Sequence, residues 1–258
     1  MLNLESMFSL KGKNAVVIGG SKGIGREMAT GLSAAGATVI ISSRKQDELD
    51  VTAKEIAELT GNTVCGMAAD VSSKEGVQKI VDEVVEKFEH IDILVNCAGV
   101  NARSSALDFT EEEWDVVQNT QLKGVFLMCQ AVGRQMVEKG IKGKIINIGS
   151  ISSQIGLPNM VSYCSAKGGI VQLSRALAVE WAQYGICVNA MIPGYTKTVM
   201  TKPIFDNPVR VAELMPRIPL KRFAECEDYR GIAVYLASPA SDYVTGVAIP
   251  VDGGWLGC

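Results

Sequence analysis

The stretch AVVIGGSKGIG, residues 15–25, decides the fold of this chain. Its first five residues are an apolar run predicted as a buried strand, and its glycine-rich end opens a predicted helix, 24–35. A strand that passes through a tight glycine turn into a helix is typical of the first unit of a dinucleotide-binding α/β fold. Gly19, Gly23 and Gly25 let the backbone turn and approach a pyrophosphate at the helix N-terminus. The spacing is GxxxGxG, and glycines at such a turn are often only structural, so the turn alone is a weak signal.

Outward from this turn, short apolar runs alternate with longer amphipathic segments. Seven runs are predicted as strands: 15–19, 38–42, 63–67, 92–96, 144–148, 186–192 and 247–251. The segments between them are predicted as helices: 24–35, 46–60, 74–89, 111–139, 160–184 and 226–237. Strands that are apolar almost throughout are buried on both faces, as in a parallel sheet covered by helices. The sequence therefore predicts an α/β single-domain Rossmann fold over residues 1–258, with a seven-stranded parallel sheet and helices on both faces. The segment from about 196 to 225 carries prolines and basic residues, and is predicted as an irregular substrate lid.

Composition excludes several classes of function. The 258 residues are 47% hydrophobic and 21% charged, with a net charge of −3, so we expect an ordinary globular protein that binds no nucleic acid. The seven cysteines form no CxxC pair, which favours reduced thiols and a cytoplasmic location. The first 20 residues have no signal-peptide pattern. The uncharged stretch 145–166 is interleaved with polar residues, so no membrane association is expected.

The single histidine, His90, narrows the chemistry. It lies in KFEHIDILV, just before a predicted strand, and is predicted as a surface turn residue. A Ser-His-Asp relay would need His90 as its base, and a zinc site would need a cluster of cysteines and histidines. Neither pattern is present, so we expect no metal, and any acid–base chemistry must use Tyr, Lys, Asp, Glu or Cys.

The second predicted strand ends in SSRK, residues 42–45. An NAD site places an acid there for the ribose 2′-hydroxyl, whereas an arginine accommodates the 2′-phosphate of NADP. Ser43 and Arg44 occupy this turn and Lys22 lies in the glycine turn, so NADP(H) is favoured and NAD(H) is possible. The alternative is that both basic residues are only solvated. Asp70 ends the third predicted strand and either caps a helix or contacts the adenine amino group.

Ser150, Tyr163 and Lys167 follow one another in INIGSISSQIGLPNMVSYCSAK. Tyr163 and Lys167 are four residues apart in a predicted helix, so their side chains share a face. An ammonium beside a phenol favours the phenolate, which predicts a Tyr163 pKa below the usual ~10. Tyr163 is then the predicted acid or base, and Ser150, at the end of a strand, is predicted to hold the substrate oxygen.

These motifs together resemble those of the short-chain dehydrogenase/reductase family, and the resemblance covers nearly the whole chain. IGGSKGIG is similar to the family's TGxxxGxG, with Ile18 in place of threonine, and NCAG (96–99) is similar to its NNAG, with Cys97 in the second position. The serine, the YxxxK pair, the Pro193-Gly194 pair and Thr198 also match, and TGVAIPVDGGW resembles the family's last strand and oligomerising tail.

The resemblance implies hydride transfer between a nicotinamide and a carbonyl or secondary alcohol. The resemblance also implies that, in this reaction, Tyr163 exchanges the proton, Ser150 polarises the substrate oxygen, and Lys167 holds the ribose hydroxyls of the cofactor. Together with the reasoning above it predicts these cofactor contacts: Gly19, Ser21, Lys22, Gly23, Ile24, Gly25, Ser43, Arg44, Asp70, Val71, Asn96, Ala98, Gly99, Tyr163, Lys167, Pro193, Gly194, Thr196 and Thr198. A homotetramer or homodimer is the family expectation.

Gln121 departs from the family pattern. The family has an asparagine that positions a water near the lysine, in a segment close to VNLKG, and this chain has TQLKG there. Gln121 also interrupts a predicted apolar helical face made of Trp114, Val117, Val125, Met128 and Val132. Asn119 lies roughly 200° around an α-helix from Gln121 and could replace it only across a local break. We therefore predict Gln121 as a fourth catalytic residue.

For the substrate, the chain most resembles the gluconate 5-dehydrogenase and 2-deoxygluconate dehydrogenase branch, which acts on sugar acids and polyols. Arg103, after the fourth predicted strand, is a candidate carboxylate clamp, with a solvated loop arginine as the alternative. A reductase of a steroid or a 3-oxoacyl thioester is the enzyme alternative, since the apolar side chains Met200, Ile204, Phe205 and Met215 could line a lid. A non-catalytic NADP(H)-binding regulator is the alternative from another class, and only Gln121 favours it.

Overall fold

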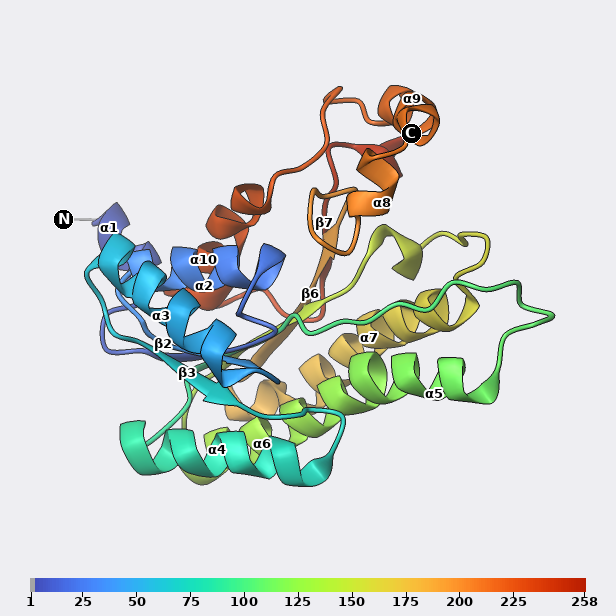
Figure 1. Cartoon of the computed structure of the whole chain (residues 1–258). Coiled ribbons are helices and arrows are strands. Elements are labelled where there is room, and N and C mark those ends of the chain that lie inside the picture. Colours follow the sequence, from blue (N-terminus) through green and yellow to red (C-terminus); the bar gives the residue numbers. More distant parts are fainter. Residues whose placement is uncertain (1–2) are drawn as a thin grey trace.

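The computed structural model describes residues 3–258, and in that range seven strands form one parallel sheet (Figure 1). The strands are β1 (Asn14–Ile18), β2 (Thr38–Ser43), β3 (Val64–Ala68), β4 (Ile93–Asn96), β5 (Lys144–Ile148), β6 (Cys187–Pro193) and β7 (Ala248–Val251). Their order across the sheet is β3-β2-β1-β4-β5-β6-β7. Because β1 pairs with both β2 and β4, the direction of strand addition reverses at β1, and ligands of open α/β sheets bind at such a switch point. The predicted fold class is confirmed.

Ten α-helices accompany the strands in the described range. They are α1 (Leu4–Phe8), α2 (Gly23–Ala34), α3 (Gln46–Thr60), α4 (Lys74–Phe88), α5 (Glu111–Gln118), α6 (Gly124–Glu138), α7 (Val161–Trp181), α8 (Lys202–Phe205), α9 (Pro208–Leu214) and α10 (Arg230–Ala237). The sequence did not predict α1. The predicted helix 111–139 is interrupted by a π-helical turn, η1 (Asn119–Lys123), and the predicted helix 226–237 begins as a 3₁₀ turn, Cys226–Tyr229.

Helices cover both faces of the sheet, as predicted. Figure 1 shows α2, α3 and α10 over one face and α4, α5, α6 and α7 over the other. Within β1, Val16 and Ile18 pack with residues of α4, α6 and α7, whereas Ala15 and Val17 pack with residues of α2, α3 and α10. The alternation of side chains along a strand thus divides the interior into two apolar layers. No helix between residues 3 and 258 is both long enough and apolar enough to cross a bilayer.

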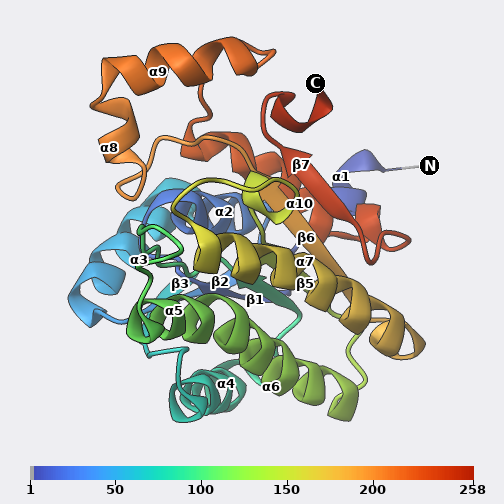
Figure 2. The same cartoon turned by 90° about the vertical axis from the view of Figure 1, so that its right-hand side faces the viewer.

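The segment 196–225 is not the irregular lid that was expected, because it contains α8 and α9. Asn207 caps α9 by accepting hydrogen bonds from the backbone N–H groups of Val209 and Arg210, and Pro208 is its first residue. An asparagine cap followed by proline is a helix-start signal. Figure 2 shows both helices outside the layers that cover the sheet.

The apolar side chains of the segment 196–225 belong to a third packed cluster. Leu214 and Ile218 are buried there against Trp255 near the C-terminus, and the Phe205 ring meets the Phe223 ring edge-on at a centroid distance of 4.8 Å.

His90 lies in the turn between α4 and β4, where its Nε2 is 3.1 Å from Asp92 Oδ2. Its side chain is 31% exposed, so the predicted turn position is confirmed.

Candidate active site

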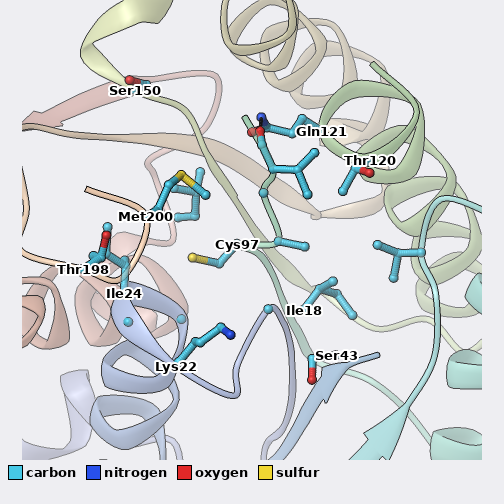
Figure 3. Close-up of a pocket in the computed structure, with 18 of the residues that line it drawn as sticks. Ile18, Lys22, Ile24, Ser43, Cys97, Thr120, Gln121, Ser150, Thr198 and Met200 are labelled. Carbon is cyan, nitrogen blue, oxygen red and sulfur yellow. Dashed lines mark hydrogen bonds between the residues drawn. The ribbon is translucent and has the colours of Figure 1, made fainter. Parts of the chain in front are cut away.

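One cleft, with a volume of about 750 Å³, brings most of the predicted site residues together. In Figure 3, Lys22 and Ser43 lie at one end, Ser150 and Gln121 lie at the other, and Cys97 lies between them. The predicted residues that line it are Gly19, Ser21, Lys22, Gly23, Ile24, Gly25, Ser43, Arg44, Asp70, Val71, Ala98, Gly99, Gln121, Ser150, Tyr163, Lys167, Pro193, Gly194, Thr196 and Thr198. The cleft follows the carboxyl ends of the strands, where the reversal at β1 leaves a crevice.

The glycine turn is shaped by close backbone approaches. A Cβ on Gly25 would lie 2.2 Å from the Gly19 carbonyl oxygen, and one on Gly19 would lie 2.7 Å from the Ala98 nitrogen. Gly19 and Gly23 also have φ values of +77° and +61°, which residues with a Cβ rarely adopt. The turn therefore brings bare backbone N–H groups to the start of α2, as a pyrophosphate requires.

The outer end of the cleft offers hydroxyls and positive charge. Ser43 Oγ is buried and has no hydrogen-bond partner in residues 3–258. The Arg44 side chain is exposed, and its guanidinium forms no salt bridge with the described residues. An unpartnered buried hydroxyl beside a free guanidinium fits the 2′-phosphate end of NADP better than the 2′-hydroxyl end of NAD.

Asp70 does not cap a helix. Ser73 caps α4 by accepting from the Gly76 N–H, and Asp70 Oδ1 instead accepts from Ser72, from its N–H at 2.9 Å and its hydroxyl at 2.7 Å. These hydrogen bonds from Ser72 lower the pKa of Asp70. The cap reading is wrong, and the carboxylate remains in the cleft wall as a candidate adenine contact.

Ser150, Tyr163 and Lys167 converge at the inner end. Ser150 follows β5, and its Oγ accepts from the Ser152 N–H at 3.2 Å. Tyr163 and Lys167 are one turn apart on α7, with Lys167 Nζ 5.6 Å from the centroid of the Tyr163 ring. The Lys167 ammonium also donates to the Ile148 carbonyl oxygen at 2.7 Å, which fixes its position beside the tyrosine.

The expected low pKa of Tyr163 is wrong for the protein chain alone. Burial raises the pKa of Tyr163 to about 12, against a lowering contribution from the Ser150 hydrogen bond. Burial also lowers the pKa of Lys167 to about 8. In a buried site, desolvation of the charged forms outweighs the attraction between phenolate and ammonium.

Gln121 is fully buried, and only the nitrogen of its amide has a hydrogen-bond partner. Its Nε2 donates to the Val100 carbonyl oxygen, whereas its Oε1 is buried without a partner in residues 3–258. A Cβ on Gly99 would lie 3.2 Å from this Oε1, so the amide sits directly behind the loop that follows β4. The unpartnered acceptor lies in the wall of the cleft.

The π-helical turn η1 is a local break in the predicted helix 111–139. The Gly124 N–H bonds to the Asn119 carbonyl oxygen across five residues, and both Asn119 and Gln121 line the cleft. The wider turn changes which residues share a face. Trp114, in α5 before this turn, is 38% exposed, so its predicted place on the buried face is wrong, while Val117 is fully buried.

Three predicted residues are placed differently from expectation. Asn96 is buried beneath the cleft, where its Nδ2 donates to Asn147 Oδ1 at 2.8 Å, so its position does not support a cofactor contact. Thr196 lines the cleft, but its hydroxyl bonds to the Tyr229 hydroxyl. Arg103 is exposed and is not among the residues of the cleft wall.

Sequence reasoning missed several residues of the cleft. Those of α5 and η1 recur at helical spacing: Glu112, Asp115, Val116, Asn119 and Thr120. Their spacing indicates a shared face, but nothing in the sequence says that this face meets the cleft. Cys97 and Met200 also line it, and burial raises the pKa of the Cys97 thiol to about 11.

The segment 196–225 begins against the glycine turn. Thr198 bonds to Thr201 through its N–H and its hydroxyl, both at 2.9 Å. A Cβ on Gly23 would lie 3.7 Å from Thr198 Cγ2, which is an ordinary van der Waals contact, so the start of this segment lies close to the glycine turn.

Comparison with known proteins agrees with this geometry. Residues 19–256 match the protein family described as enoyl-(acyl carrier protein) reductase. The 2-dehydro-3-deoxy-D-gluconate 5-dehydrogenase of Escherichia coli is 42% identical over 252 residues, which are 97% of this chain and 98% of that protein. The 5-keto-D-gluconate 5-reductase of Escherichia coli is 36% identical over 253 residues, 98% of this chain and 99% of that protein.

Among solved structures, a gluconate 5-dehydrogenase from Burkholderia cenocepacia, in complex with NADP and tartrate, is 34% identical. It superposes with a TM-score of 0.95 over 99% of this chain and 100% of its own. Likeness of this extent, in enzymes that share one fold and one kind of reaction, shows that the chain is an oxidoreductase and belongs to the short-chain dehydrogenase/reductase family.

Proposed function

We propose that this enzyme interconverts a secondary hydroxyl and a ketone on a sugar acid, with NADP(H) as the preferred cofactor. The observation that carries the proposal is the inner end of the cleft, where Ser150, Tyr163 and Lys167 meet beside a wall shaped for a dinucleotide. The gluconate-type activities of the relatives support a sugar acid as the substrate class.

The site residues divide the chemistry among them. Tyr163 exchanges the proton of the substrate oxygen, and Ser150 holds that oxygen through its hydroxyl. The Lys167 ammonium, fixed by its bond to the Ile148 carbonyl oxygen, holds the ribose hydroxyls and favours the phenolate. The cofactor, when bound, supplies or accepts the hydride, and its oxidised ring adds a positive charge that lowers the tyrosine pKa. Since burial raises the Tyr163 pKa to about 12, that added charge would favour the phenolate that accepts the proton when the alcohol is oxidised.

Gln121 is proposed to serve proton transfer through its unpartnered Oε1. This oxygen is a buried acceptor, and the Lys167 ammonium has donor capacity beyond its one bond to Ile148. A water between the two groups would satisfy both, and the extra methylene of Gln relative to Asn alters the geometry of such a relay.

Arg103 is proposed to bind the substrate carboxylate. Its guanidinium has no salt bridge in the described residues, although it lies near two tyrosines of this region. Burial raises the pKa of Tyr195, and the charges of Arg210, Arg217 and Arg103 oppose that rise. Arg210 is paired with Glu213 and Arg217 stacks on Trp255 at 4.2 Å, which leaves Arg103 as the free guanidinium of the three. A loop arginine without an anionic partner suits a carboxylate brought by the substrate.

The cofactor proposal rests on Ser43 and Arg44 at the outer end of the cleft. A carboxylate is missing at the position that would bind a 2′-hydroxyl, so NADP(H) is preferred and NAD(H) remains possible. The bound NADP of the Burkholderia cenocepacia relative supports this assignment.

The alternative functions find less support. Ile204, Phe205 and Met215 pack into the third apolar cluster, and only Met200 of the four apolar lid residues lines the cleft. A steroid or a 3-oxoacyl thioester would therefore meet little apolar lid surface. A non-catalytic regulator is not supported either, because Ser150, Tyr163 and Lys167 are all present and line the same cleft.

We further propose that residues 1–258 act as one dinucleotide-binding domain whose segment 196–225 is the substrate lid. The enzyme is proposed to be cytoplasmic and to assemble as a homotetramer or a homodimer, without nucleic acid or membrane partners.

A substrate panel tests the function. Sugar acids, polyols and ketones are assayed with NADP(H) and NAD(H) in both directions, and we expect the highest kcat/KM for a sugar acid with NADP(H). Tyr163→Phe should abolish turnover while leaving cofactor binding measurable. Equal turnover of neutral polyols and sugar acids would contradict the carboxylate assignment, and no turnover of any panel member would favour the regulator.

A further inference from the structure

Three cations lie at or beside the outer end of the cleft: Lys22 and Arg44 line it, and Lys45, next to Arg44 in the chain, does not. Lys22 lies in the glycine turn, and Arg44 and Lys45 follow β2. Lys45 Nζ donates to Glu48 Oε1 at 2.9 Å, and Lys22 Nζ is 3.8 Å from Glu48 Oε2. Among these three cations, Arg44 alone has no carboxylate partner in residues 3–258.

The single carboxylate of Glu48 thus interacts with two of the three cations, Lys45 and Lys22. It lies in the first turn of α3, where the helix dipole favours a negative charge. The Lys45 hydrogen bond, followed by the charge of Lys22, lowers its pKa, so the carboxylate is ionised at neutral pH. Its side chain is 40% exposed, so an incoming anion has access to the same lysines.

A 2′-phosphate and this carboxylate compete for the same partners. The phosphate monoester carries a charge of about −1.5 to −2 near neutral pH, whereas the 2′-hydroxyl of NAD(H) carries none. The negative charge of Glu48 therefore opposes binding of NADP(H) and leaves NAD(H) almost unaffected.

We propose that Glu48 is a specificity-determining residue that limits the preference for NADP(H) over NAD(H) by occupying Lys22 and Lys45. The inference rests on the proposed cofactor assignment, because it requires the 2′-phosphate to lie beside Arg44.

Glu48→Gln, compared with Glu58→Gln, tests this inference. Glu58 lies near the C-terminal end of the same helix and is paired with Lys54 at 3.9 Å, so its substitution makes the same change in net charge about three helical turns away from Glu48. Dissociation constants of NADP⁺ and NAD⁺ are measured by calorimetry for the parent and both variants. The titrations are run at about 0.02 M and about 0.5 M salt, because screening weakens interactions between exposed charges.

Glu48→Gln should lower the Kd of NADP⁺ by about two- to five-fold at low salt, the range expected for exposed charge pairs, and leave that of NAD⁺ unchanged. The gain should shrink at high salt and be absent in Glu58→Gln. Equal changes for both nucleotides, no change for either, weaker NADP⁺ binding, or the same gain in Glu58→Gln would each overturn the inference.

Arg44→Ala separates this inference from the cofactor assignment on which it rests. If Arg44→Ala leaves the ratio of the two Kd values unchanged, the outer end of the cleft does not bind the 2′-phosphate, and the cofactor proposal fails. If Arg44→Ala selectively weakens NADP⁺ binding while Glu48→Gln changes nothing, the cofactor proposal stands and the Glu48 inference alone is wrong.

Discussion

Replacing Gln121 by methionine separates a role in proton transfer from a role in packing. Methionine keeps the unbranched length of the side chain and removes both polar atoms of the amide. Gln121→Asn is the matched variant, because it keeps the amide and shortens the chain by one methylene. We expect turnover to fall at least ten-fold in Gln121→Met, and to be kept or raised in Gln121→Asn.

The stability change in Gln121→Met is expected to be small. Loss of Nε2 leaves the buried Val100 carbonyl oxygen without this donor, which costs about 1–3 kcal/mol. Removal of the unpartnered Oε1 eliminates a desolvation cost of about the same size, which stabilises the folded state. The two terms offset each other, so the free energy of unfolding should change by less than about 1 kcal/mol. Gln121→Ala should also lower turnover, but it opens a cavity that costs about 2–5 kcal/mol, which makes it the poorer probe.

The assay combines kcat as a function of pH with urea unfolding of each variant. A ten-fold fall in kcat corresponds to about 1.4 kcal/mol of lost transition-state stabilisation. The expected change in the free energy of unfolding is smaller than this, so a loss of folded protein would not account for the fall in kcat. If Gln121→Met turns over like the parent with an unchanged pH profile, the relay bypasses this residue and the amide is only part of the packing.

Four further substitutions test the site. Arg44→Ser should reduce kcat/KM with NADP(H) more than with NAD(H), and a parent enzyme that works as well with NAD(H) would contradict the cofactor proposal. Lys167→Ala should raise the cofactor Kd and lower turnover together, and an unchanged Kd would remove the ribose-holding role. Lys167→Met should raise the free energy of unfolding at pH 7 by up to about 3 kcal/mol, because the buried lysine pKa, lowered from 10.5 to about 8, makes protonated Lys167 costly in the folded state. That gain should fade as pH rises from 8 to 10.5, where the unfolded lysine also loses its proton. Urea titrations at pH 7 and pH 10.5 measure it, and a difference in the free energy of unfolding between variant and parent that is the same at both pH values would contradict the reasoning. Arg103→Ala should raise KM for anionic substrates more than for neutral ones, and equal effects would place Arg103 outside the substrate site.

The strands and the cleft were predictable because their signals are local. An apolar run such as AVVIG has few structural alternatives, and a glycine turn between a strand and a helix places the crevice at the carboxyl edge of the sheet. The pairing of Tyr163 with Lys167 was predictable for the same reason, since four residues make one helical turn.

The features that the sequence did not predict depend on tertiary packing. The π-helical turn at Asn119–Lys123 has no glycine or proline at its start, and its backbone geometry is set by contacts with neighbouring elements. The pKa of Tyr163 depends on how completely the site excludes water, which spacing along the chain does not reveal. Asn96 belongs to a matching motif, and only the fold shows that its amide is used beneath the cleft to bind Asn147. The helix α9 is different, because Asn207 and Pro208 are a helix-start signal that is local in the sequence.

The approach of Thr198 to Gly23 bears on how cofactor and substrate bind together. We expect a dinucleotide on the glycine turn to lie beside the first residues of the proposed lid, 196–225, and to stabilise one position of that segment. By thermodynamic linkage, a substrate that needs the lid in that position binds more tightly after the cofactor, and the cofactor dissociates more slowly while the substrate remains. We therefore expect each ligand to lower the Kd of the other by the same factor, and titrations of each with and without the other would report it directly.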